Sequence, residues 1–108
     1  MIRLAAWAVV CLTLAGCAAT RTWISPLEAK GRAFAVETCG SCHYVEGEAA
    51  KPLNPALPFR EMGRLYGDVS LDSQIEQIGS RGHHDVPSLE INDGQRRALI
   101  AYIAQLRP

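Results

Sequence analysis

Apolar residues recur at helical spacing along most of this chain, and few segments alternate as a half-buried β-strand would. A first helix is predicted over residues 26–38. Ser25 can cap this helix, Pro26 suits its first position, and Glu28 completes a capping box with Ser25. Small side chains along the helix would let a partner helix approach closely; they are Ala29, Gly31, Ala33 and Ala35.

A loop and two short helices are predicted next. Residues 44–58 hold three prolines among polar residues, a composition that predicts no regular element. Residues 59–66 have apolar side chains on one helical face, which places Met62 toward a core. A further helix is predicted over residues 71–78, with Ser70 as its cap. Two glycines are expected to end this helix: Gly79 and Gly82.

The C-terminal segment predicts a final amphipathic helix. Asn92 can cap its first turn, and Gln95, three residues later, can return the hydrogen bond. Four apolar side chains form a stripe at helical spacing: Leu99, Tyr102, Ile103 and Leu106. Together these patterns predict an all-α fold.

The N-terminal residues 1–16 have the features of an export signal. Arg3 supplies a positive charge. Residues 4–14 form an uncharged apolar run, shorter than the about 20 residues that a membrane-spanning helix needs. The run ends in Leu-Ala-Gly-Cys at residues 14–17, which resembles the bacterial lipobox at all four positions. This resemblance implies cleavage before Cys17 and attachment of lipid to its sulfur.

Acyl chains on Cys17 would attach the protein stably to a membrane, because each buried methylene contributes about 0.8 kcal/mol. Residues 17–24 then form a lipid-anchored tether, followed by one domain over residues 25–108. Ala18 stands where lipoproteins kept at the inner membrane often have Asp, so the outer membrane is favoured. The alternatives are an ordinary secretory signal, with Cys17 incidental, and an uncleaved membrane helix.

Charge and cysteine content narrow the function further. The 11 basic and 11 acidic residues give a formal net charge of zero, which argues against nucleic acid as a partner. A chain of 108 residues builds a core that is marginal by itself. Two cysteines lie in the N-terminal segment and two in one motif, so we expect no structural disulfide; they are Cys11, Cys17, Cys39 and Cys42.

The pentapeptide Cys-Gly-Ser-Cys-His at residues 39–43 is the main chemical motif. It matches C-x-x-C-H, the attachment signature of c-type haem. The thiols of Cys39 and Cys42 can form thioethers with the two porphyrin vinyl groups, which places His43 to bind the iron as the proximal ligand. A redox dithiol would be expected near a βαβ pattern. A structural zinc site would need two further ligands, for which His83 and His84 are candidates.

The surroundings of the motif resemble a class I c-type cytochrome of the small bacterial monohaem kind. Gly31 lies eight residues before Cys39, as in that family, where it lets the first and last helices cross closely. The run Leu-Ile-Ala-Tyr-Ile at residues 99–103 resembles the last helix of the family. The resemblance covers about residues 25–107 and implies three to five short helices around one covalently attached haem c.

A segment before the second helix carries a further resemblance. Residues 57–60, Leu-Pro-Phe-Arg, resemble a Pro-x-Phe-Arg segment of small bacterial members of the family. In that family a loop proline carbonyl accepts a hydrogen bond from Nδ1–H of the proximal histidine, which makes the imidazole a better ligand. The resemblance implies Pro58 as the acceptor. Pro55, twelve residues after His43, is the second choice.

Residues 82–87 depart from the family, in which this loop commonly reads G-H-x-x-M-P and the Met sulfur is the sixth iron ligand. Val86 stands at the Met position, and valine cannot bind iron. Met62 is an unfavoured substitute because it lies on an apolar helix face. His84 lies two residues before Val86 and would point to the same side in an extended loop, so it is the first choice as distal ligand. His83 is the second choice among the histidines, and an open distal position, with neither histidine bound, stands beside bis-histidine ligation as the alternative.

The resemblance implies an electron carrier rather than an enzyme, acting at the periplasmic or outer face of a bacterial membrane. Without the Met ligand, its reduction potential is predicted to lie below that of Met/His relatives. If the distal position is open, the alternative is a haem protein that binds NO, CO or peroxide as a sensor or scavenger, with weak peroxidase activity. The expected partners are redox proteins and, through the lipid anchor, the membrane.

Overall fold

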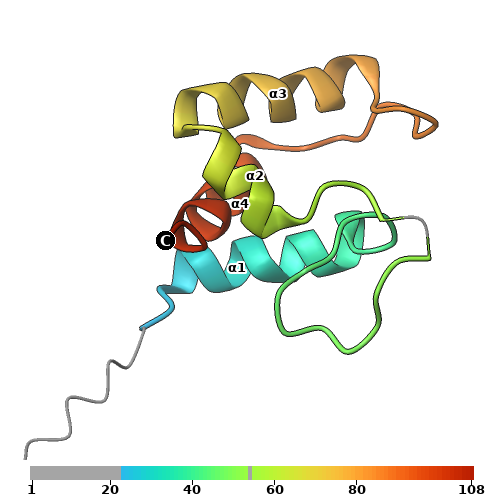
Figure 1. Ribbon diagram of the computed structural model, residues 1–108. Helices are drawn as coiled ribbons and strands as arrows, with labels where there is room; N and C mark the ends of the chain where they lie inside the picture. The colour runs from blue at the N-terminus through green and yellow to red at the C-terminus, as the bar shows by residue number, and fades with distance from the viewer. Residues whose placement is uncertain (1–22, 54) are drawn as a thin grey trace, which may run out of the picture.

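Every regular element in the computed structural model is helical, within the residues that it describes, 23–53 and 55–108 (Figure 1). The elements are α1 (Pro26–Phe34), the π-helical turn η1 (Ala35–Cys39), α2 (Phe59–Leu65), α3 (Asp68–Arg81) and α4 (Asp93–Gln105). Two isolated bridges are the β-type pairings of this part of the chain: His43 with Ala56, and His83 with Val86. The predicted all-α fold is confirmed.

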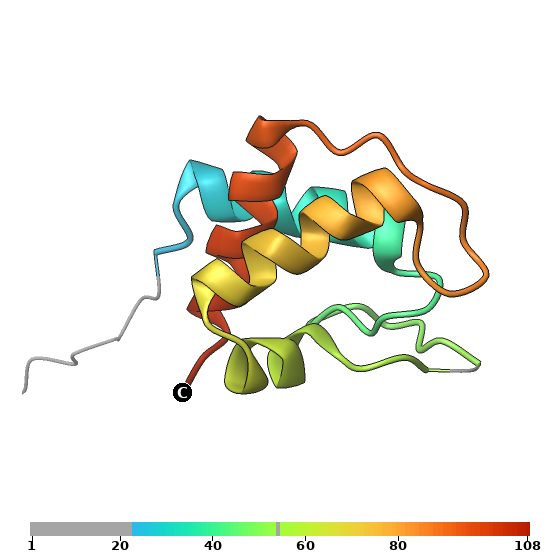
Figure 2. The ribbon, with the colours of Figure 1, turned by 90° about the horizontal axis from the view of Figure 1, so that it is seen from above.

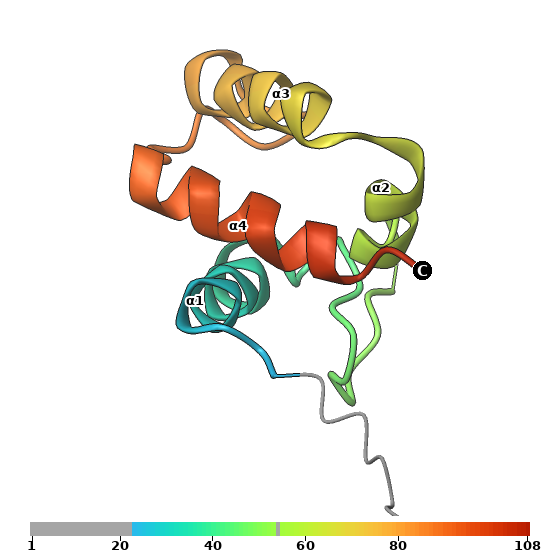
Figure 3. The same ribbon diagram turned by 90° about the vertical axis from the view of Figure 1, so that its left-hand side faces the viewer.

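The first and last helices cross at close range, with α4 lying across α1 (Figure 3). Gly31 of α1 is buried at the crossing. A Cβ atom on Gly31 would lie 1.9 Å from the Ala98 carbonyl oxygen and 2.9 Å from the Tyr102 Cβ. Only a residue without a side chain fits there, so the role expected for Gly31 is confirmed.

Both helices at the crossing start with the predicted capping boxes. The Ser25 hydroxyl accepts the backbone N–H of Glu28 at 3.2 Å, and the Glu28 carboxylate accepts the backbone N–H of Ser25 at 2.7 Å. Asn92 and Gln95 make the same pair of bonds, at 2.8 and 3.0 Å. The expected stripe of α4 is buried: Leu99, Tyr102, Ile103 and Leu106.

The first helix differs from its prediction near its end. It changes from α-helical to π-helical geometry at Ala35, so the predicted span of 26–38 is covered by two elements. The wider turn of η1 ends on Cys39, the first residue of the C-x-x-C-H motif. Single π-turns are rare and often lie at functional sites.

The helix α3 is longer than predicted at both ends. It begins at Asp68 rather than after Ser70, because Gly67 accepts the first helical bond from Leu71 N–H at 3.0 Å. An ion pair of 2.7 Å between Asp68 and Arg107 also holds this first turn on the C-terminal segment. The helix continues through Gly79 to Arg81 and is capped by Gly82, whose φ of +82° lies in the left-handed region that glycine adopts without strain.

The short helix α2 agrees with its prediction. Phe59 is 2% exposed and belongs to the main core, and Met62 packs partly buried against that core. Phe59 and Tyr102 of α4 meet edge to face, with ring centroids 6.0 Å apart. The predicted loop before α2 has no regular element among its described residues.

The predicted signal of residues 1–16, Cys17 and most of the tether at 17–24 lie outside the described residues. Among the residues that are described, no helix is both long enough and apolar enough to cross a membrane.

Candidate functional site

The C-x-x-C-H motif forms a single turn at the end of η1. The backbone N–H groups of Cys42 and His43 both donate to the carbonyl of Cys39, at 3.2 and 2.9 Å. Cys39 is half-buried, Cys42 is exposed, and both carry free thiols. The turn therefore presents two thiols and one imidazole within five residues, as attachment of a c-type haem requires.

The Cys39 thiol is a weaker acid than an ordinary cysteine thiol. Burial, together with the charge of Cys42, raises the pKa of Cys39 to about 11. A reactive dithiol needs a lowered pKa, because the thiolate is the nucleophile. Cys39 therefore lacks the lowered pKa that an attacking thiol needs.

The imidazole of His43 is held by a backbone carbonyl. Its Nδ1 lies 2.7 Å from the carbonyl oxygen of Leu57. A carbonyl can only accept, so Nδ1 carries the proton and Nε2 keeps the lone pair that binds a metal. The acceptor predicted from the resemblance was Pro58, with Pro55 second, and both predictions are wrong.

The reason lies in the start of α2. Pro58 is the residue before this helix, and its carbonyl accepts the N–H of Met62 at 3.0 Å. Leu57, one residue earlier, precedes the helix and leaves its carbonyl for His43. Two backbone hydrogen bonds hold the segment before α2 beside the motif. The N–H of Ala56 donates to the Cys42 carbonyl at 2.8 Å, and the N–H of Phe59 donates to the Tyr44 carbonyl at 3.3 Å.

The segment after α3 forms a tight turn. His83 and Val86 exchange both backbone hydrogen bonds, at 3.0 and 2.9 Å. His84 lies at the tip of this turn, exposed and with a φ of +48°. His84 was predicted as the first choice because an extended loop would align it with Val86. That premise is wrong, since the two residues lie in a turn.

His83, the second choice, is the histidine that lies beside His43. Their ring centroids are 5.9 Å apart, and the ring planes are inclined by 21°. His84 packs against His83 instead in a T-shaped arrangement, with ring centroids 5.1 Å apart and ring planes inclined by 72°. Figure 2 shows the segment after α3, in orange, on the same side of the molecule as the end of η1. Partial burial and the nearby His43 and His84 lower the pKa of His83, which favours its neutral form.

The structure does not bring the remaining candidate ligands close to the His43 ring. Met62 packs on the core from α2, as the sequence pattern predicted. Val86 is an aliphatic side chain, 38% exposed. No three His, Cys, Asp or Glu side chains within 23–53 and 55–108 surround a common metal position. The alternative zinc site of Cys39, Cys42, His83 and His84 is therefore not supported.

Sequence reasoning missed an arginine clamp on the loop after the motif. Arg32 of α1 donates to the Glu46 carbonyl at 3.0 Å and to the Glu48 carboxylate at 2.8 Å. Arg60 of α2 pairs with the Glu46 carboxylate at 3.1 Å. These contacts tie the 44–48 segment to both helices. No local pattern signals them, because the partners lie 14 or more residues apart.

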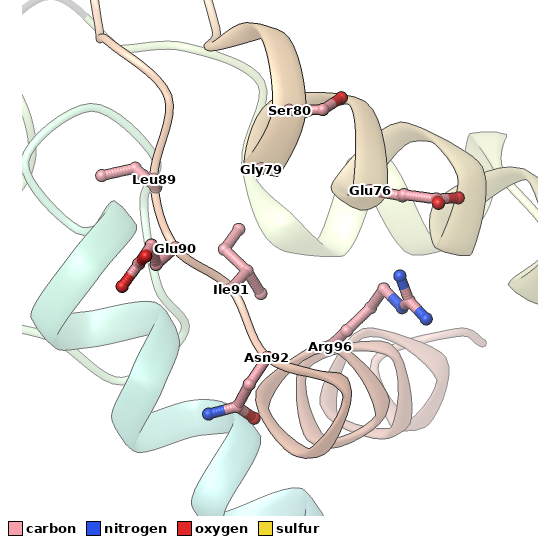
Figure 4. Close-up of a pocket in the computed structure, with 8 residues that line it drawn as sticks. All are labelled: Glu76, Gly79, Ser80, Leu89, Glu90, Ile91, Asn92 and Arg96. Carbon is pink, nitrogen blue, oxygen red and sulfur yellow. The ribbon is translucent and has the colours of Figure 1, made fainter.

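A surface pocket of about 400 Å³ lies between α3, the segment after it and the start of α4 (Figure 4). It is lined by Glu76, Gly79, Ser80, Leu89, Glu90, Ile91, Asn92 and Arg96. None of these residues belongs to the C-x-x-C-H motif or to the His83 turn. The pocket is separate from the candidate haem site.

Comparison with known families agrees with this site. The family model of cytochrome c matches residues 28–107, which is most of the chain, so the chain belongs to the cytochrome c family. Searches of curated proteins and of solved structures found no match. Members of this family carry covalent haem c, so membership of the family confirms the predicted cofactor.

The described residues fit this cofactor. Two free thiols stand three positions apart on one turn. The Nε2 of His43 is available because Nδ1 is engaged by Leu57. A second imidazole, that of His83, lies close by. The two thiols and the Nε2 of His43 are the groups that would hold a haem c here.

Proposed function

We propose that this protein is a monohaem electron carrier, in which Cys39 and Cys42 form the thioether bonds and His43 is the proximal iron ligand. Each thioether arises when an S–H group adds across one vinyl double bond, with no other reactant consumed. The observation that carries the proposal is the exposure of Cys42 on the turn that also holds His43. A porphyrin edge bonded at Cys42 would lie at the surface, where redox partners can approach.

The side chains of this site position the cofactor and need no acid or base of their own. Haem c, when bound, supplies one iron that accepts and releases a single electron. Leu57 orients the His43 ring and strengthens its Nε2 as a ligand. Phe59 supports the same ring from the core side, with centroids 5.5 Å apart. A ligand held in one orientation moves little between the two oxidation states, which favours fast electron exchange.

The test is to produce the full chain in a bacterium that attaches c-type haem. We expect haem that stays with the polypeptide on a denaturing gel, and a reversible one-electron titration. Cys39→Ala and Cys42→Ala should each weaken covalent attachment, whereas Ser41→Ala, within the same turn, should leave it intact. Absence of haem, or a haem that does not cycle reversibly, would contradict the proposal.

We also propose a location for this activity. Residues 1–16 act as an export signal, and lipid on Cys17 anchors the domain at the periplasmic face of a membrane, with the outer membrane favoured by Ala18. Cys17→Ser should release the haem protein from the membrane fraction, while Cys11→Ser should not. Mass spectrometry of the mature N-terminus distinguishes a lipidated Cys17 from ordinary cleavage.

Binding of a small ligand such as NO, CO or peroxide is the competing function. It requires an iron position opposite His43 that no side chain occupies. His83 lies with its ring 5.9 Å from that of His43, which supports electron transfer over ligand binding. The expected partners are redox proteins that dock at the exposed haem edge.

A further inference from the structure

We propose that His83 is the sixth ligand of the haem iron, so that two histidines, His43 and His83, bind it from opposite faces. This inference rests on the proposed haem site. It differs from what the sequence favoured, because His84 was the first choice there. It also differs from the His/Met pair that the G-H-x-x-M-P loop supplies in the family.

The distance between the two rings carries the proposal. The centroids of His43 and His83 are 5.9 Å apart. Metal–imidazole bonds are about 2 Å long and each ring centre lies about 1 Å beyond its nitrogen, so two imidazoles on opposite sides of one metal have centres about 6 Å apart. The observed separation therefore matches that of an axial pair. The rings are stacked, with their planes inclined by 21°, so binding from both sides requires the Nε2 atom of each ring, rather than its face, to point to the iron.

The backbone holds His83 in this position. Both main-chain polar groups of His83 bond to Val86. Gly82, immediately before it, has a φ of +82°, and a Cβ there would lie 2.7 Å from the Val86 carbonyl oxygen. The turn thus depends on glycine at position 82 and fixes the direction from which the His83 side chain leaves. A ligand on such a preorganised turn loses little conformational freedom when it binds.

The other candidates are placed elsewhere. His84 is exposed at the tip of the turn and forms a T-shaped pair with His83. Val86 has no donor atom, and its aliphatic side chain stands where the family has methionine. Met62 belongs to the packing of α2 on the core. Of the described histidines, His83 is the one whose ring lies near that of His43.

Two properties follow from a second histidine ligand. The iron has no free position, so external ligands such as CO do not bind the reduced protein. The potential lies below that of His/Met cytochromes, because replacing an axial Met removes the ligand that raises it. Both properties are measurable without knowing the electron donor or acceptor.

The experiment compares the full-length holoprotein with His83→Ala and His84→Ala. We expect the visible spectrum of the reduced wild-type protein to be unchanged by CO, and the ferric protein to be low-spin by electron paramagnetic resonance. His83→Ala should become high-spin and bind CO, and added imidazole should restore the low-spin spectrum. His84→Ala should behave as the wild type. High-spin iron in His83→Ala, with low-spin iron kept in His84→Ala, identifies His83 as the ligand, and rescue by imidazole shows that the vacated iron position is accessible.

A second variant covers the case in which His83→Ala loses its fold. His83→Met keeps a ligating side chain, and we expect it to raise the midpoint potential and to add a methionine–iron charge-transfer band in the ferric form. CO binding by the wild-type protein would overturn the proposal, as would high-spin iron in His84→Ala alone. Either result leaves electron transfer by a covalent haem standing, whereas a chain without haem would remove both proposals together.

Discussion

Gly31 and Ala98 bring the backbones of α1 and α4 into direct contact. A methyl group on Gly31 would lie 1.9 Å from the Ala98 carbonyl oxygen, far inside van der Waals contact. The obstacle is main chain rather than a flexible side chain, so rotamer changes cannot relieve it. The fold depends on the absence of a side chain at this residue.

The first prediction follows from this contact. Gly31→Ala should lower the free energy of unfolding by about 3 kcal/mol, the upper part of the range for overpacking, because the two helices must separate. Gly79→Ala in α3 is the matched control, since its nearest contact would be 3.4 Å, to the Leu89 carbonyl. It should be neutral or stabilising by up to about 1 kcal/mol. Denaturant titrations of the two holoproteins give the comparison, and equal effects would refute the packing argument.

The second prediction concerns the clamp on the loop after the motif. Arg32→Ala removes two hydrogen bonds, to the Glu46 carbonyl and the Glu48 carboxylate, and should cost about 1–2 kcal/mol in the free energy of unfolding. Arg64→Ala removes a more exposed pair with Glu61 and should cost under about 0.5 kcal/mol. A loss in Arg64→Ala as large as that in Arg32→Ala would show that the clamp has no special role.

The third prediction concerns the aromatic support of His43. Phe59→Ala should destabilise the fold by about 3–5 kcal/mol, because Phe59 is 2% exposed and sits among the core residues. Phe59→Leu should keep the fold and shift the midpoint potential, because the ring that stands 5.5 Å from His43 is lost. Leu65→Ala, at a side chain that is 57% exposed, should change neither property. Thermal unfolding and potentiometric titration report the two effects separately.

The fourth prediction concerns the carbonyl that holds His43. In the reduced protein, the Nδ1–H proton of His43 should be protected from exchange and show nuclear magnetic resonance coupling to the Leu57 carbonyl carbon. Coupling to Pro58 instead would restore the assignment that the family resemblance suggested. Leu57→Ala should leave the bond in place, because the acceptor belongs to the main chain.

Local patterns predicted much of the fold. Each capping box joins two residues that lie three apart in the sequence. Local sequence was therefore enough to predict both boxes, Ser25 with Glu28 and Asn92 with Gln95. The helix α3 starts earlier than predicted, and its first turn is also held by an ion pair between Asp68 and Arg107, from the other end of the chain. Contacts at such separations leave no periodic signal in the sequence.

The sequence by itself determined the chemistry of this protein. The motif at residues 39–43 indicates a covalent haem c, because attachment of this cofactor requires two thiols and an imidazole at that spacing. Val86 likewise removes the usual methionine ligand without reference to any structure.

The tertiary structure decided which groups complete the site. Leu57 rather than Pro58 holds His43, because the carbonyl of Pro58 points along α2 to the N–H of Met62. His83 rather than His84 faces His43, because the segment folds as a tight turn and not as an extended strand. Two adjacent backbone carbonyls, or two adjacent histidines, carry the same chemistry in the sequence, and only the path of the backbone decides which of them points to the site.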